Sequence, residues 1–112
     1  MRFMMEYPEF IKNMPSAEIP FEGAAANLLT GKEGQAAFFK LKKGFLVPPH
    51  SHGEQWGIMV SGELELTIGE ETKVYKAGDS YYIGEGVTHS ANCLTDVLAI
   101  DIFADPERYK AR

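Results

Sequence analysis

Short apolar segments with alternating polar positions occupy most of the chain, and turn residues separate them. In the segment 63–68, Leu64, Leu66 and Ile68 fall on one face of an extended strand and the two glutamates on the other. Further strands are predicted at residues 24–30, 35–42, 45–47, 72–76, 80–83 and 97–103. Because the strands are many and short and no long helix is indicated, the pattern predicts an all-β sandwich or barrel.

The two ends of the chain lack this alternation. Residues 1–23 are interrupted by prolines, and we expect them to form an arm that packs on a barrel domain of residues 24–112. The expected anchors of the arm are its apolar residues Phe3, Phe10, Ile11 and Phe21. Residues 105–112 are expected to form a short terminal helix.

Composition excludes several classes of partner. The 112 residues suit one domain, and the net charge of −5, with no dense run of lysine and arginine, argues against a nucleic-acid partner. No apolar stretch approaches the roughly 20 residues of a membrane span, and the acidic first ten residues lack the apolar core of a signal peptide. Cys93 is the single cysteine and excludes an internal disulfide. We therefore expect a cytoplasmic protein with a small-molecule substrate, and neither a membrane nor a nucleic-acid partner.

All three histidines of the chain fit one metal site. His50 and His52 form an H-x-H pair, and on an extended segment both imidazoles point the same way and can reach one ion. His89 comes from a later segment, and Gln55 or Glu54 can supply a fourth ligand. Imidazole and oxygen ligands are compatible with Zn, Ni, Fe, Co or Mn. The sequence thus predicts one divalent transition metal.

Glycines frame these histidines at fixed spacings. Gly44 lies six positions before His50 and Gly62 seven after Gln55, and the second block is Gly78, Gly84, Gly86, His89 and Asn92. This resembles the two motifs of the cupin superfamily, G-x5-H-x-H-x(3,4)-E-x6-G and G-x5-P-x-G-x2-H-x3-N, over about residues 40–103. The chain departs from them by a Gln at the usual Glu, a shorter spacer after His52, a Gly at the motif Pro and an early Asn92. The resemblance implies a jelly-roll barrel, also described as a double-stranded β-helix, that holds a metal through its histidines.

Strand parity bears on the fourth ligand. If Gln55 faces the cavity, Gly57 and Met59 do so too, and the apolar residues Trp56, Ile58 and Val60 face outward. Filling of the core alone would favour Glu54, whereas the spacing to Gly62 favours Gln55, which we prefer. The outer stripe then predicts a homodimer, or cover by the arm.

The ligand set also bears on the chemistry. Three neutral imidazoles and an amide leave a divalent ion its full charge, whereas a glutamate would lower that charge by one. The more positive site is a stronger Lewis acid and stabilises a trivalent state less well. Non-redox chemistry is therefore favoured.

Asp101 is the one carboxylate within the apolar segment 97–103 and shares its face with Val97, Ala99 and Phe103. If that face lines the barrel, Asp101 is a buried acid or base near the metal; if it faces outward, Asp101 is a solvated strand residue. Arg108 either binds a substrate carboxylate or is exposed. Tyr81, Tyr82, Phe38 and Phe39 are expected to be structural aromatics rather than substrate platforms.

The three histidines and Gln55, together with the Asp-x-Phe of residues 101–103, are similar to the small cupins of pectin and alginate breakdown. Those proteins convert 4,5-unsaturated monouronates to open-chain ketouronates. The resemblance implies that Asp101 moves a proton and that Arg108 pairs with the uronate carboxylate. Our hypothesis is a metal-dependent isomerisation or ring opening of a small, oxygen-rich, carboxylated sugar. The alternatives are an iron-dependent dioxygenase and a non-catalytic metal- or sugar-binding module, so catalysis itself stays open.

Overall fold

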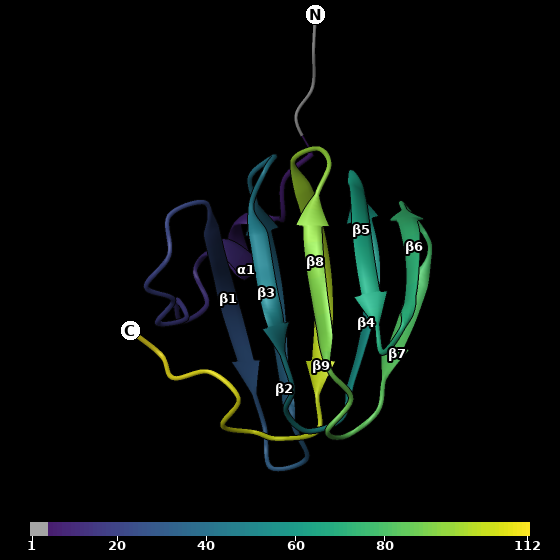
Figure 1. The fold of residues 1–112 in the computed structure, drawn as a ribbon. Helices are drawn as coiled ribbons and strands as arrows, with labels where there is room; N and C mark the ends of the chain where they lie inside the picture. The colour runs from purple at the N-terminus through teal and green to yellow at the C-terminus, as the bar shows by residue number, and fades with distance from the viewer. Residues whose placement is uncertain (1–4) are drawn as a thin grey trace, which may run out of the picture.

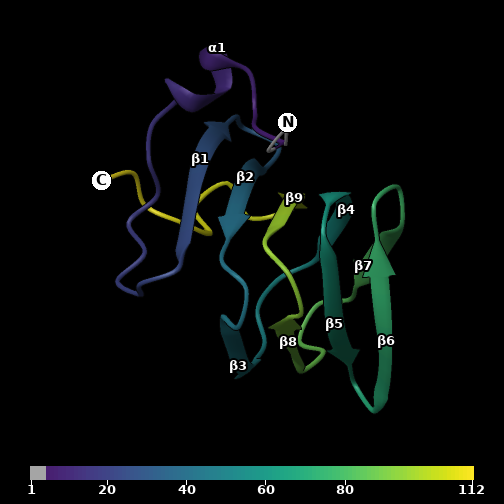
Figure 2. The same ribbon diagram turned by 90° about the horizontal axis from the view of Figure 1, so that it is seen from above.

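The computed structural model describes residues 5–112 as two antiparallel sheets that face each other (Figures 1 and 2). One sheet has five strands in the order β1-β2-β9-β4-β7 and the other has four in the order β3-β8-β5-β6. In chain order the elements are α1 (Glu9–Lys12), β1 (Ala24–Thr30), β2 (Gln35–Leu41), β3 (Leu46–His50), β4 (Gln55–Ser61), β5 (Glu63–Ile68), β6 (Glu71–Lys76), β7 (Ser80–Ile83), β8 (His89–Cys93) and β9 (Val97–Phe103). This confirms the all-β class that the alternating pattern predicts and the jelly roll that the resemblance implies.

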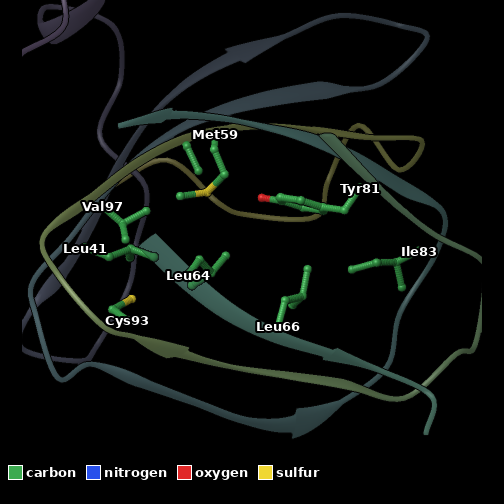
Figure 3. Packing of buried hydrophobic residues seen from close by; sticks show 9 residues of the cluster. Leu41, Met59, Leu64, Leu66, Tyr81, Ile83, Cys93 and Val97 are labelled. Carbon is green, nitrogen blue, oxygen red and sulfur yellow. The ribbon is translucent and has the colours of Figure 1, made fainter. Parts of the chain in front are cut away.

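The core lies between the sheets, as Figure 3 shows, and its members come from both of them. Its buried residues are Leu41, Met59, Leu64, Leu66, Tyr81, Ile83, Cys93, Val97 and Ala99. Leu64 and Leu66 point inward, as the alternation in β5 predicts. Gly62 joins β4 to β5 at a φ of 89°, where an added Cβ would press on the backbone of Asp96, so only glycine fits this turn.

Backbone contacts connect the segments before β1 and after β9. The amide of Glu18 donates to the carbonyl of Lys110 at 2.7 Å, and that of Arg112 donates to the carbonyl of Ser16 at 2.7 Å. Ala17 and Ala111 form an antiparallel bridge between these two hydrogen bonds. The terminal helix expected at residues 105–112 is therefore wrong, because the segment is held by contacts across the chain instead of by an apolar helical face.

Residues 5–23 contact the barrel at points that mostly differ from the expected anchors. The hydroxyl of Tyr7 donates to the carbonyls of Phe39 and Ala99, at 2.7 and 3.1 Å. Phe10 and Phe21 are exposed, and Phe3 lies outside the described residues. Of the expected anchors that the structure describes, only Ile11 is half-buried; Ala17 is buried instead, and Ile19 packs against the same apolar cluster. In the described part of the chain, no helix is long and apolar enough to cross a membrane.

Candidate metal and ligand site

The three histidines converge where β3 meets β8. His50 ends β3 and lies opposite His89, the first residue of β8, while His52 follows two residues later. Pro48 and Pro49 have no N–H to donate, and the register of the two strands shifts between Val47 and His50. The ligand nitrogens of the three histidines lie within 4.8 Å of one another. They could therefore hold one metal ion, as the H-x-H pattern predicts.

Hydrogen bonds fix the orientation of each imidazole. The Nδ1 atoms of His50, His52 and His89 lie 2.9, 2.8 and 2.9 Å from the backbone carbonyls of Pro48, Gly53 and Val87. A carbonyl can only accept, so each Nδ1 carries the hydrogen and each Nε2 keeps a free lone pair. Metal-binding histidines are oriented in this way. Burial lowers the pKa of His52 to about 4 and also lowers that of His89, which favours the neutral ligand form.

Gln55 opens β4 and faces the cavity, whereas Glu54 is exposed and contacts the hydroxyl of Tyr82. The Gln55 Nε2 donates to Asp101 Oδ1 at 2.8 Å, and its Oε1 is buried without a partner in the described structure. Leaving a buried acceptor unpaired costs about 1–3 kcal/mol, which a cation would offset. Together with three imidazoles this oxygen fits a divalent ion. Figure 1 shows β4 behind the sheet that carries His50 and His89.

Asp101 is buried at the inner face of β9, where it is 3% exposed. Burial raises the pKa of its carboxyl to about 6, although hydrogen bonds from Gln55 and Tyr81 act in the opposite direction. Gly57 lies opposite Asp101 in the ladder, and a Cβ there would overlap the Asp101 carboxylate and the Tyr81 ring. Sequence reasoning missed the role of Gly57, and its signal was a glycine within a strand pattern.

Arg108 lines the same cavity from the segment after β9. Its guanidinium lies over the ring of Tyr109, 4.4 Å from the centroid, and its Nε is buried without a partner among the described residues. Gln35 fixes this segment, because its Nε2 donates to the carbonyl of Tyr109 and its Oε1 accepts from the Tyr109 amide, both at 3.0 Å. Gln35 was also missed; an inward-facing amide in an apolar strand was its signal.

These side chains enclose one cavity of about 440 Å³ between the two sheets. His50, His52, Gln55, His89, Asp101 and Arg108 all line it. Tyr81 does so as well, and Figure 3 shows its side chain extending into the space between the sheets. The expectation that Tyr81 belongs to the core is confirmed, but the residue also belongs to the cavity wall.

Comparisons with known proteins identify the family and the fold. A family model described as a cupin domain matches residues 37–103. H2HPP isomerase of Bacillus subtilis is 43% identical over 75 residues, which cover 56% of this chain and 32% of that protein. The match therefore spans about a third of that relative's length.

Solved structures show the same fold. An RmlC-like cupin from Shewanella frigidimarina is 29% identical, with a TM-score of 0.79 over 93% of this chain and 94% of its own. KdgF from Halomonas sp. is 26% identical, with a TM-score of 0.75 over 82% of this chain and 86% of its own.

Proposed function

Because this chain belongs to the cupin domain family, we propose that it is a metal-dependent isomerase that moves a proton on a small carboxylated substrate. The observation that carries the proposal is the hydrogen bond of 2.8 Å between half-buried Gln55 and buried Asp101, in the cavity that the three converging histidines also line. The partial match to a protein named as an isomerase supports the reaction class.

Different residues of the cavity would bind the metal and transfer the proton. His50, His52, His89 and the Gln55 Oε1 would hold the ion, which when bound supplies positive charge that stabilises a developing oxygen anion. Asp101 takes the proton from one substrate atom and returns it at another, so the composition of the substrate does not change. The hydrogen bond from Gln55 keeps the Asp101 carboxylate aimed along the cavity.

Arg108 would bind the substrate carboxylate. Its guanidinium lies over the Tyr109 ring, and no carboxylate in the described part of the chain forms an ion pair with it. A planar guanidinium can donate two parallel hydrogen bonds to one carboxylate, which fixes the direction of the substrate. The resemblance to cupins that open unsaturated monouronates makes those sugars the first substrate class to assay.

Asp101→Asn tests the proton-transfer role. A positioned acid/base group typically contributes about 10² to 10⁴ in rate, so turnover should fall by that factor while metal content stays unchanged. Asp79→Asn is the matched control, because Asp79 lies in an exposed turn outside the cavity. Full activity of Asp101→Asn would refute the role. Oxygen uptake coupled to turnover would instead favour the iron-dependent dioxygenase.

Metal binding is tested separately by elemental analysis. Each of His50→Ala, His52→Ala and His89→Ala should lose most of the metal found in the wild-type protein, because each variant leaves only two of the three imidazole ligands. Lys40→Ala, an exposed change outside the cavity lining, should retain it. Stoichiometric metal in the triple histidine variant would contradict the site.

We also propose that a second copy of the chain covers the outer face of the five-stranded sheet. Trp56 lies between Ile102 and Tyr82 in the ladder, and the three side chains are 42, 44 and 57% exposed. Light scattering should give twice the 12.4 kDa chain mass. Trp56→Glu should halve that mass, and Val74→Glu on β6 should not. A single chain mass for the wild-type protein at micromolar concentration would refute the dimer.

A further inference from the structure

We infer that the cavity selects a carboxylate whose body is an apolar ring or chain, rather than a sugar that carries several hydroxyl groups. The inference rests on the proposed function, whose substrate class it narrows. Its starting observation is that most residues lining the 440 Å³ cavity carry hydrocarbon side chains.

Strand register separates the cavity into two ends. Gln55 lies opposite Phe103 next to the histidines, and one inward step further Gly57 lies opposite Asp101. The next inward step brings Met59 opposite Ala99, which also pairs with Phe39. Each step is two residues, or about 7 Å. The polar wall of the five-stranded sheet therefore stops at Asp101 and its neighbour Tyr81.

The facing sheet repeats this order. Ile68 pairs with His89, Ala91 with Leu66 and Cys93 with Leu64 as β8 runs away from the histidines. Ser90 is the neighbour of His89 at the polar end, and Glu18 is an exposed residue of the first 23. A substrate with its carboxylate at the polar end thus places its body against leucine and phenylalanine, with Asp101 at the boundary between the two ends.

At the apolar end, the hydroxyl groups of a sugar would lack hydrogen-bond partners. Each hydroxyl gives up hydrogen bonds to water on entry, and the hydrocarbon side chains there return none. An apolar ring gives up no hydrogen bonds and gains from leaving water. A hydrophobic pocket discriminates by about 10² against an isostere that adds one hydroxyl when that hydroxyl is left unpaired.

The rim of the cavity has the same character. Phe21 and Leu46 are 61 and 64% exposed, and both line the cavity. Large apolar side chains exposed together at the mouth of a pocket are typical of a surface that meets an apolar ligand. Arg108 is the sole lysine or arginine among the described residues that line the cavity, which matches a ligand with one carboxylate.

Calorimetric titration of the purified protein, with its metal content measured, tests the inference without turnover. The two probes are 3-phenylpropionate and D-galacturonate, each a monocarboxylate with a six-membered ring. We expect 3-phenylpropionate to bind at least about 100-fold more tightly. Equal or tighter binding of galacturonate, or no detectable binding of 3-phenylpropionate at millimolar concentration, would overturn the inference.

Two isosteric variants locate the contact. Val47→Thr replaces a methyl group of the cavity wall by a hydroxyl and should weaken 3-phenylpropionate binding about 5-fold or more. Val74→Thr makes the same change on β6, outside the cavity, and should leave binding unchanged. Equal affinities of the two variants would place the probe elsewhere and so contradict the inference.

The titration tests the substrate class and the activity assay tests the proton-transfer role, so one claim can be refuted while the other stands. If 3-phenylpropionate is preferred but Asp101→Asn has no effect on turnover, the substrate class stands and the proton-transfer role is wrong. If a uronate is isomerised in a reaction that depends on Asp101 and binds more tightly than 3-phenylpropionate, the proposed function stands and this inference is overturned.

Discussion

Replacing Gly57 with alanine would add a methyl group at the most crowded point of the cavity wall. Its Cβ would lie closer than 3.0 Å to the Asp101 carboxylate and to the ring of Tyr81, a separation that real Cβ atoms essentially never show. Both neighbours are buried and held by packing, so neither can move without displacing others. Overpacking of this kind typically costs about 1–3 kcal/mol.

The melting temperature converts this cost into a measurable change. For a chain of 112 residues, each kcal/mol corresponds to about 4 °C, so Gly57→Ala should melt roughly 4–12 °C below the wild type. Because a displacement of about 1 Å at a catalytic group can cost 10²-fold, kcat should fall by at least about 10-fold. Metal content should be retained, since the three histidines come from β3, the segment after it and β8.

Gly31→Ala is the matched control. Gly31 has open space around its Cβ position and no positive φ, so this variant should melt within about 1 °C of the wild type or slightly above it. Calorimetry on both variants, followed by activity at saturating substrate, separates packing from a general glycine effect. If Gly57→Ala kept the wild-type melting temperature and kcat, the close approach of Asp101 and Tyr81 to this backbone would be refuted.

Three further predictions concern residues around the core. Gln35→Leu removes both hydrogen bonds to the Tyr109 backbone, so it should cost about 1–3 kcal/mol in urea unfolding and raise KM more than it lowers kcat, since it frees Arg108. Burial raises the pKa of Cys93 from about 9 to about 11, so the stability that its neutral thiol contributes is present below pH 9 and lost as the pH rises to 11. Between pH 8 and 11, the free energy of unfolding in urea should therefore fall less steeply with pH for Cys93→Ala than for the wild type. An equal fall with pH in both proteins would refute this. Tyr7→Phe should cost about 1–2 kcal/mol in the same assay through its two carbonyl contacts, and the exposed Tyr82→Phe should cost less.

Alternation and the histidine spacing carried most of the sequence prediction. The strands at residues 24–30, 63–68, 80–83 and 97–103 have the bounds expected, because one buried and one solvated face impose a period of two. β8 was not among the predicted strands, since His89–Cys93 is short and mixes polar with small residues. Its strand conformation depends on pairing with β3 and β5, which no local pattern reports.

In the candidate site too, local sequence pattern predicts some features, and others depend on strand pairing. The spacing to Gly62 favoured Gln55 over Glu54 as the inward residue, and Gln55 lines the cavity. Parity left both faces of the last strand open for Asp101, which the structure buries on the inner face of β9. Their hydrogen bond, 46 residues apart in sequence, follows from the pairing of those two strands, which the sequence does not state. Gln35 acts on the chain 74 residues further on through backbone atoms, and backbone partners leave no sequence pattern.

The antiparallel bridge between Ala17 and Ala111 allows the side chains that line the cavity to change in evolution while the position of the two bridged segments is kept. The flanking hydrogen bonds of Glu18 and Arg112 join backbone atoms, so side chains in both segments can be exchanged while the linkage persists. The same two segments supply Phe21 and Arg108 to the cavity. A lineage could therefore change the selected ligand by point substitutions in these segments, with the strands that carry the histidines left untouched.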